Sequence, residues 1–145
     1  MEIFENRRGH FLISTDPALL QVDVIHNFLS NTSYWAHGRP LKVVKTSIEN
    51  SLCFGVYADG KQVGFARIVT DYATFAWLCD VFILPEQRGH GLGKWLVDCV
   101  VAHPAMAALK RMVLATQDAH ELYRRYGDFE TLPNPEYWMV RIKTE

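Results

Sequence analysis

Residues 80–101 (DVFILPEQRGHGLGKWLVDCVV) constrain the fold more than any other part of the chain. The segment begins with an apolar run typical of a buried strand, and Pro85 ends this run because proline cannot donate a hydrogen bond to a sheet. A basic, glycine-rich loop follows at 87–94. Apolar residues then recur on one helical face, at Leu92, Leu96, Val97, Val100 and Val101. The sequence therefore predicts a strand, a glycine loop and a helix in direct succession.

This loop has the properties of a phosphate-binding site. Its glycines, Gly89, Gly91 and Gly93, let the backbone approach a ligand without a clash from Cβ atoms. The first turn of the following helix leaves N–H groups unpaired, and the helix dipole favours an anion there. Arg88 and Lys94 add positive charge. A glycine-rich connection without any ligand is the alternative interpretation.

The glycine spacing disfavours two common phosphate-binding motifs. A Walker loop needs glycine where this chain has Arg88, and serine or threonine where it has Trp95. The dinucleotide fingerprint reads G-x-G-x-x-G, whereas this loop reads G-x-G-x-G. A nucleotide-binding protein of either kind is therefore disfavoured.

Composition is that of an ordinary soluble domain. The 145 residues suit one domain over 1–145, with 49% hydrophobic and 21% charged residues. A net charge of −1 gives no reason to expect nucleic acid, and no apolar run approaches the roughly 20 residues of a membrane span. The charged N-terminus does not resemble a signal peptide. We expect a cytoplasmic protein that binds neither nucleic acid nor membrane.

The three cysteines, Cys53, Cys79 and Cys99, lie in apolar stretches and form no C-x-x-C pair. We therefore expect buried, reduced thiols, with no disulfide and no metal site.

Periodicity and turn residues predict the remaining elements. Strands are expected at 10–14, 51–58, 62–70, 73–84, 111–115 and 137–142. Helices are expected from Asp16 to about Ser30, from Pro40, after the glycine loop, and at 118–126. Asp16 is predicted to cap its helix, and Asp59-Gly60 predicts a hairpin turn. Asp118 with Glu121 resembles a capping box, and Gly127 suits a left-handed helix end. A mixed sheet flanked by helices, of the α/β (α+β) class, is the natural assembly.

The glycine loop resembles the pyrophosphate-binding loop of the GNAT superfamily of N-acyltransferases. Arg88, Gly91 and Gly93 fill the family pattern Arg/Gln-x-x-Gly-x-Gly/Ala. The order of the predicted elements also matches the GNAT fold over nearly the whole chain.

A second, separate segment carries the same resemblance. Residues 114–127 (LATQDAHELYRRYG) are similar to the family's strand and helix that end in Tyr-x-x-x-Gly-Phe, with Tyr123 and Gly127 in the matching positions. Asp128 intervenes before Phe129, a departure that leaves the tyrosine in place.

The resemblance implies an acetyltransferase that moves an acetyl group from acetyl-CoA to a primary amine by direct attack in a ternary complex. It implies that the strand edge Val81, Phe82 and Ile83 holds the pantetheine amides. It further implies that the acyl group lies where this strand splays from 111–115. The loop residues implied to bind the pyrophosphate are Arg88, Gly89, His90, Gly91, Leu92, Gly93 and Lys94. A catalytically silent coenzyme A-binding regulatory or interaction module is the alternative.

The reaction needs a base and an acid, because an ammonium with a pKa near ~10 must lose a proton and the leaving thiolate can take one. The resemblance implies Tyr123 as the acid, although Tyr123 also belongs to an apolar helical stripe. Asp80 is the candidate base, in an apolar strand and on the face of Phe82. A structural ion pair with Arg67 explains a buried Asp80 equally well. Asp71 and His120 are weaker base candidates.

The family builds its acceptor site from the loop between the first two helices and the facing strand turns. This implies Trp35, Arg39 and Tyr72 as substrate-binding residues, with Tyr34, His37 and Trp77 beside them. Arg39 suits a carboxylate or phosphate, and the aromatics suit an amine, although loop aromatics also serve to cover a core edge. The expected partner is a small-molecule or peptide amine. A homodimer is expected by analogy alone.

Overall fold

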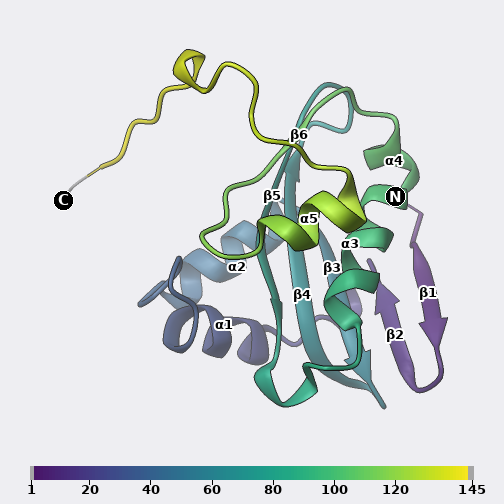
Figure 1. Ribbon diagram of the computed structural model, residues 1–145. Helices are drawn as coiled ribbons and strands as arrows, with labels where there is room; N and C mark the ends of the chain where they lie inside the picture. Colours follow the sequence, from purple (N-terminus) through teal and green to yellow (C-terminus); the bar gives the residue numbers. More distant parts are fainter. Residues whose placement is uncertain (1, 144–145) are drawn as a thin grey trace.

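A six-stranded mixed sheet runs through the molecule in the computed structural model, which describes residues 2–143 (Figure 1). The strands are β1 (Glu5–Arg8), β2 (Phe11–Ser14), β3 (Leu52–Ala58), β4 (Lys61–Thr70), β5 (Ala76–Ile83) and β6 (Met112–Val113). Their order in the sheet follows the chain, and every pair is antiparallel except β5 with β6, which is parallel. The predicted mixed sheet flanked by helices is confirmed.

Helices cover both faces of this sheet. One face carries α1 (Val22–Asn31) and α2 (Leu41–Glu49), and the other carries α3 (Leu92–Ala102), α4 (Pro104–Ala107) and α5 (His120–Gly127) (Figure 1). Short 3-10 turns lie at Pro17–Leu19, Pro85–Gln87 and Pro135–Tyr137. No helix within residues 2–143 is long and apolar enough to cross a membrane.

The two faces have separate apolar cores. Under α3, Trp95 and Leu96 are buried against the side chains of β3 and β4, including Phe54. On the opposite face, the rings of Phe28 and Phe82 stack with centroids 4.1 Å apart. Burying a large apolar side chain contributes roughly 1.5–3 kcal/mol, so these two clusters hold the helices against the sheet.

A bulge interrupts β5 at Asp80. The pairing with β4 passes from Phe65↔Phe82 to Arg67↔Cys79, so β5 has one more residue than β4 in this interval. Asp80 takes up the extra residue with a φ of +52°, in the left-handed region. A bulge redirects a side chain and bends its strand. Asp80 and Phe82 both lie on the α1–α2 side of the sheet, as the alternation predicted.

β5 and β6 pair over two positions only, Ala76↔Met112 and Trp77↔Val113. Beyond Trp77 the two strands diverge, and β5 continues to Ile83 with a strand neighbour, among the described residues, on the β4 side alone. The splay implied by the family resemblance is therefore present.

The predicted final strand at 137–142 is wrong. Residues 138–143 have no regular structure, and the segment leads away from the sheet (Figure 1). Strand preference describes how well a side chain fits a pleated, partly buried surface, so a strand-forming sequence without a neighbouring strand stays irregular. The adjacent edge of β6 is consequently left without a strand partner among residues 2–143.

Both predicted end signals of α5 are also wrong. The helix starts two residues later than predicted, and Thr116 Oγ1 accepts a hydrogen bond from the Ala119 N–H at its start. Asp128 supplies the left-handed stop with a φ of +55°. Gly127 has a packing role instead, because a Cβ there would lie 2.8 Å from the Phe129 ring.

The N-terminal region differs from prediction in two respects. Asp16 caps the 3-10 turn Pro17–Leu19, and α1 begins afterwards at Val22. β1 was not predicted, because its four residues, ENRR, are all polar and carry no strand signal. In the structure they are exposed and pair with β2. The hairpin turn at Asp59-Gly60 is confirmed, since both residues have positive φ angles, 49° and 82°.

Gly64→Ala is expected to destabilise the fold by about 1–3 kcal/mol, because over-packing a filled site forces the neighbours apart. The added Cβ would lie 2.7 Å from Ile83 Cδ1 and 3.0 Å from the Phe82 carbonyl oxygen. Urea unfolding measures the change. Gly93→Ala is the matched control, because a Cβ there meets nothing within 4 Å. Equal stabilities for the two variants would contradict the packing role of Gly64.

Candidate functional site

A cavity of about 510 Å³ opens where β5 and β6 diverge. β5 forms one wall and the segment that follows β6 forms the opposite wall. The loop between α1 and α2 borders the cavity on a third side, and α5 contributes Tyr123. β4 contributes Arg67, so the splay of two strands brings together residues from several separate parts of the chain.

Tyr123 lies in this cavity, and its side chain is largely buried. Burial raises the pKa of the phenol to about 12, and the neighbouring Tyr34 and Asp118 act in the same direction. The ring is held by an edge contact with Phe129, with centroids 5.8 Å apart. The hydroxyl is therefore protonated at neutral pH and available as a proton donor.

Asp80 is buried at the centre of a polar cluster. Its Oδ2 accepts hydrogen bonds from Arg67 Nε and Arg39 Nη1, both at 2.8 Å, and its Oδ1 accepts one from Trp35 Nε1 at 2.9 Å. Burial alone raises the pKa of the carboxyl, but the hydrogen bond and charge of Arg67, with Arg39 and Trp35, hold it below its usual value. Such a carboxylate is always ionised near neutral pH and is a weak proton acceptor.

The expected ion pair of Asp80 with Arg67 is present, and Arg39 and Trp35 are additional partners. Because both carboxylate oxygens are engaged, this geometry favours the structural interpretation of Asp80 over the general base. The cluster also ties the loop between α1 and α2 to the sheet. Trp35 and Arg39 are thereby held beside the cavity that they line.

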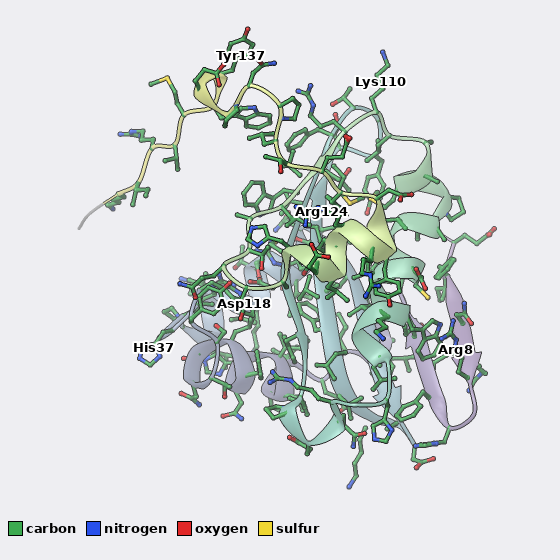
Figure 2. All side chains as sticks on the ribbon, in the orientation of Figure 1. Arg8, His37, Lys110, Asp118, Arg124 and Tyr137 are labelled. Carbon is green, nitrogen blue, oxygen red and sulfur yellow. The ribbon has the colours of Figure 1, made fainter. Side chains whose placement is uncertain are left out.

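The other residues considered for the acceptor site divide into two groups. Tyr34 and Trp77 line the cavity, and the Tyr34 hydroxyl accepts a hydrogen bond of 2.9 Å from the Gln117 N–H on the opposite wall. Tyr72 lies in the turn between β4 and β5, partly exposed and away from the cavity lining. His37 is exposed and points away from the body of the molecule (Figure 2).

The two weaker base candidates lie outside the cavity lining. Asp71 closes a turn, where its carboxylate accepts hydrogen bonds from the N–H groups of Ala73, Thr74 and Phe75. His120 is exposed at the first position of α5.

Asp118 lines the cavity and was overlooked as a functional residue, because the capping-box pattern assigned it to the helix end. Since Ala119 takes the cap position, the Asp118 carboxylate is free of that role. Within the described chain it accepts no hydrogen bond, and Asp80 is the other acidic residue of the cavity lining. Figure 2 labels Asp118 in the segment that leads into α5.

The glycine loop joins β5 to α3 as predicted. Gly89 and Gly91 have φ angles of 93° and 73°, and a Cβ at either position would meet nothing within 4 Å. No contact within the protein therefore requires glycine at these two positions. The space beside their backbone is open to a ligand. Among residues 2–143, no acceptor pairs with the N–H groups of 89–94, which surround the N-terminus of α3. This arrangement fits a phosphate group.

The side chains of the loop have different surroundings. Arg88 and Lys94 are exposed; Arg88 Nε donates to the Ile83 carbonyl at 3.2 Å, and Lys94 Nζ lies 5.5 Å from the centre of the Tyr126 ring. His90 is exposed and packs near Phe11. Leu92 is buried in the α3 core, so only its backbone can contact a ligand.

The end of β5 has the open edge that the resemblance implies. Phe82 turns into the α1–α2 core, and Val81 and Ile83 pack against the α3 core. Their side chains are thus used for packing, while the backbone edge that faces away from β4 has no strand partner in residues 2–143.

All three cysteines are free thiols, and Cys79 lies in the cavity lining. Burial raises the pKa of Cys79 to about 11, so the thiol stays protonated and is a poor nucleophile at neutral pH. Within residues 2–143, no group of three or more His, Cys, Asp or Glu side chains could hold a metal ion.

Comparison with known proteins identifies the family of this chain. The family model described as "Acetyltransferase (GNAT) family" matches residues 22–128. Over 159 residues the chain is 37% identical to a Gibberella zeae protein named as a "putative acetyltransferase", covering 92% of this chain and 90% of that protein.

Solved structures show the same fold. A crystal structure of "a putative acetyltransferase belonging to the gnat family" from Xanthomonas campestris pv. campestris superposes with a TM-score of 0.89 at 50% identity, covering 94% of this chain and 96% of that chain. An aminoglycoside N-acetyltransferase in complex with CoA superposes with a TM-score of 0.66 at 20% identity, covering 95% of this chain and 97% of that chain. The chain therefore belongs to the GNAT family of acetyltransferases.

Proposed function

We propose that this protein transfers the acetyl group of acetyl-CoA to a primary amine by direct attack within a ternary complex. The observation that carries the proposal is the cavity between β5 and β6. This cavity joins the open edge of β5, the protonated Tyr123 hydroxyl and the loop that carries Trp35 and Arg39.

The coenzyme-binding residues in this proposal contribute mainly through their backbone. The unpaired N–H groups of 89–94 and the dipole of α3 hold the pyrophosphate, with Arg88 and Lys94 at its sides. The open edge of β5 at Val81, Phe82 and Ile83 pairs with the pantetheine amides. Bound acetyl-CoA supplies a thioester, whose carbonyl carbon the amine attacks.

Two cavity residues move protons in this proposal. Asp118 is the acidic residue with a free carboxylate, and it accepts a proton from the incoming ammonium directly or through a water molecule. Tyr123 donates its proton to the departing thiolate sulfur, in keeping with its burial and raised pKa. The protonated thiol of Cys79 argues against an acyl-enzyme intermediate.

Asp80 has a positioning role in this proposal. Its carboxylate holds Trp35 and Arg39 at the acceptor side of the cavity and compensates the charge of Arg67. The aromatic rings of Tyr34, Trp35 and Trp77 with the nearby Asp118 suit a cationic amine, carried by a small molecule or a peptide.

A free-thiol release assay with acetyl-CoA and a panel of amines, amino acids, polyamines and peptides tests the activity. Amine-dependent release identifies the acceptor class. Thermal stabilisation by acetyl-CoA without release by any acceptor would instead favour a catalytically silent coenzyme A-binding module. Absence of both effects would contradict the coenzyme assignment.

Gly91→Val is expected to weaken acetyl-CoA binding by about tenfold or more, a loss of ~1.4 kcal/mol, measured by calorimetry. The branched side chain would occupy the open space beside the unpaired N–H groups. Gly60→Val is the matched control for backbone strain, because Gly60 also has a positive φ and open surroundings but lies in the β3–β4 turn. Unchanged affinity in Gly91→Val would remove the loop from the site.

Tyr123→Phe is expected to lower kcat roughly 100-fold and to leave acetyl-CoA affinity unchanged, because only the proton donor is lost. Since the pKa of Tyr123 is about 12, its deprotonation causes no loss of kcat between pH 7 and 10 in the wild type. Steady-state kinetics with calorimetry measure both quantities. A wild-type kcat in this variant would exclude Tyr123 as the acid.

Substitutions at the two aspartates of the cavity should have different effects: the change at Asp80 lowers stability, and the change at Asp118 lowers activity. Asp80→Asn leaves two guanidinium groups without their partner and is expected to cost about 3 kcal/mol or more. Asp118→Asn breaks no hydrogen bond and should preserve stability, while kcat/KM falls roughly 100-fold. Chemical unfolding and kinetics measure these effects. If Asp80→Asn abolishes the acidic limb of the pH–rate profile and stays stable, Asp80 is the base.

The pH dependence of stability follows from the lowered pKa of Asp80. A carboxyl with a lower pKa when folded stabilises the protein above its unfolded pKa of about 3.9. This stabilisation is lost as the pH falls below that value, through the folded pKa. The wild type should therefore lose more stability in acid than Asp80→Asn does.

A further inference from the structure

We propose that the acceptor of this protein is a small ω-amino carboxylate, in which methylene groups join the primary amine to a carboxylate that Arg39 binds. The inference rests on the proposed acetyl transfer and narrows the amine to one chemical class. It is carried by the charges of the cavity lining, by the N–H groups that remain on one guanidinium, and by the aromatic side chains between the charged groups.

The charged side chains of the cavity lining lie in two places. Arg39, Arg67 and Asp80 form one cluster, in which two guanidinium groups share a single carboxylate and leave a surplus of one positive charge. Neither guanidinium forms an ion pair with another carboxylate in residues 2–143. Asp118, on the wall that follows β6, carries a negative charge (Figure 2). A ligand that complements this lining has an ammonium at one end and an anion at the other.

Arg39 is the member of this cluster that can bind the anion. Its side chain is 23% exposed, against 13% for Arg67 and 1% for Asp80. Arg39 Nη1 donates to Asp80, and among the described residues its Nε and Nη2 groups donate to no protein acceptor. Arg67 donates to the Ser51 hydroxyl in addition to Asp80. A planar guanidinium that keeps N–H groups free binds a carboxylate strongly.

The loop between α1 and α2 holds Arg39 in place before any ligand binds. The buried Ser33 hydroxyl donates to the Leu29 carbonyl at 2.7 Å and accepts from the Ala36 N–H at 3.0 Å. The Arg39 N–H in turn donates to the Ala36 carbonyl at 3.0 Å. Because the backbone is fixed at Ala36 and the guanidinium is fixed by Asp80, little conformational freedom is lost when an anion binds.

The charge of the cluster favours a carboxylate over a phosphate. A surplus of one positive charge matches the single negative charge of a carboxylate. A phosphate group carries about −1.5 to −2 at pH 7 and presents three strong acceptor oxygens. Arg39 has already committed Nη1 to Asp80, so its remaining N–H groups suit the smaller anion.

Aromatic side chains separate the cluster from Asp118. Trp35 Nε1 donates to Asp80, and the Trp35 ring contacts Tyr34 edge-on, with centroids 5.0 Å apart. The Tyr34 hydroxyl accepts from the N–H of Gln117, the residue before Asp118. Two aromatic side chains thus lie between the positive and the negative group. An α-amino acid, with a single carbon between its charges, is too short to span them, whereas a methylene chain extends the ligand and packs on the rings.

Thiol release from acetyl-CoA by matched acceptors tests the proposal on the full chain. 5-Aminopentanoate is compared with pentylamine and 5-aminopentanamide, which have the same chain without a carboxylate. Its kcat/KM is expected to be higher by about tenfold or more, through a lower KM, because the other two lack the charged hydrogen bond. It should also exceed glycine, whose charges lie too close together. Equal values for 5-aminopentanoate and pentylamine, or a preference for glycine, would overturn the proposal.

Arg39→Gln should abolish this preference. The ratio of kcat/KM for 5-aminopentanoate to that for pentylamine is expected to fall by about tenfold, with the KM for acetyl-CoA unchanged. A general loss of activity affects both acceptors and leaves the ratio intact, and circular dichroism verifies the fold. Arg7→Gln is the matched control, because it removes the same charge from the exposed β1 at the opposite edge of the sheet. A wild-type ratio in Arg39→Gln contradicts the assignment of Arg39.

Calorimetry separates this proposal from the acetyl transfer on which it rests. 5-Aminopentanoate and pentylamine are titrated into the protein saturated with CoA, a measurement that needs no turnover. Tighter binding of 5-aminopentanoate that is lost in Arg39→Gln supports carboxylate recognition even if no thiol is released, in which case acetyl transfer alone fails. Thiol release with pentylamine, together with equal binding of the two ligands, refutes the ω-amino carboxylate and leaves the transferase intact.

Discussion

The limited pairing of β5 with β6 determines most of what this molecule can do. Two positions, Ala76↔Met112 and Trp77↔Val113, hold the strands together at one end, and the remainder of β5 has no strand partner on that side in the part of the chain that the structure describes. If β5 and β6 were paired along their full length, there would be no cavity between them and no exposed backbone edge on β5. Because the strands part after Trp77, one opening supplies both an edge for amide groups and a space for the transferred group. The site is therefore a consequence of a sheet that is left partly unpaired.

The Asp80 cluster shows how this opening is kept in shape. A buried carboxylate at a positive φ is unfavourable in two ways, since burial opposes its charge and the backbone is strained. Arg67, Arg39 and Trp35 compensate by saturating both oxygens. Because Trp35 and Arg39 come from the loop between α1 and α2, the same contacts that stabilise the bulge place the acceptor side of the cavity. Asp80 therefore contributes both to the stability of the bulge and to the position of the acceptor side of the cavity.

Local sequence was sufficient for elements whose signals are carried by neighbouring residues. The glycine loop and the start of α3, the Asp59-Gly60 hairpin and α2 follow from spacing and turn preference, whereas α1 begins at Val22 and not at Asp16 as predicted. Where competing local signals existed, the prediction failed. Asp118 with Glu121 looked like a capping box, but Thr116 satisfies the N–H at the start of α5, which leaves Asp118 facing the cavity. Gly127 looked like a helix stop, but contact with Phe129 explains why it is glycine.

The sequence by itself determined the strand, loop and helix that fit a phosphate, the tyrosine of α5 and the membership of a fold class, because each depends on residues close together in the chain. The ion pair of Asp80 with Arg67 was predicted, but only the tertiary structure decided that Arg39 and Trp35 also bind this carboxylate, since both are distant from Asp80 in sequence and meet it at a bulge that no local pattern predicts. It also decided that Tyr72 lies apart from the cavity and that residues 138–143 form no strand. Whether a segment pairs as a strand and becomes buried depends on the elements that pack against it, and the local sequence of the segment does not specify those elements.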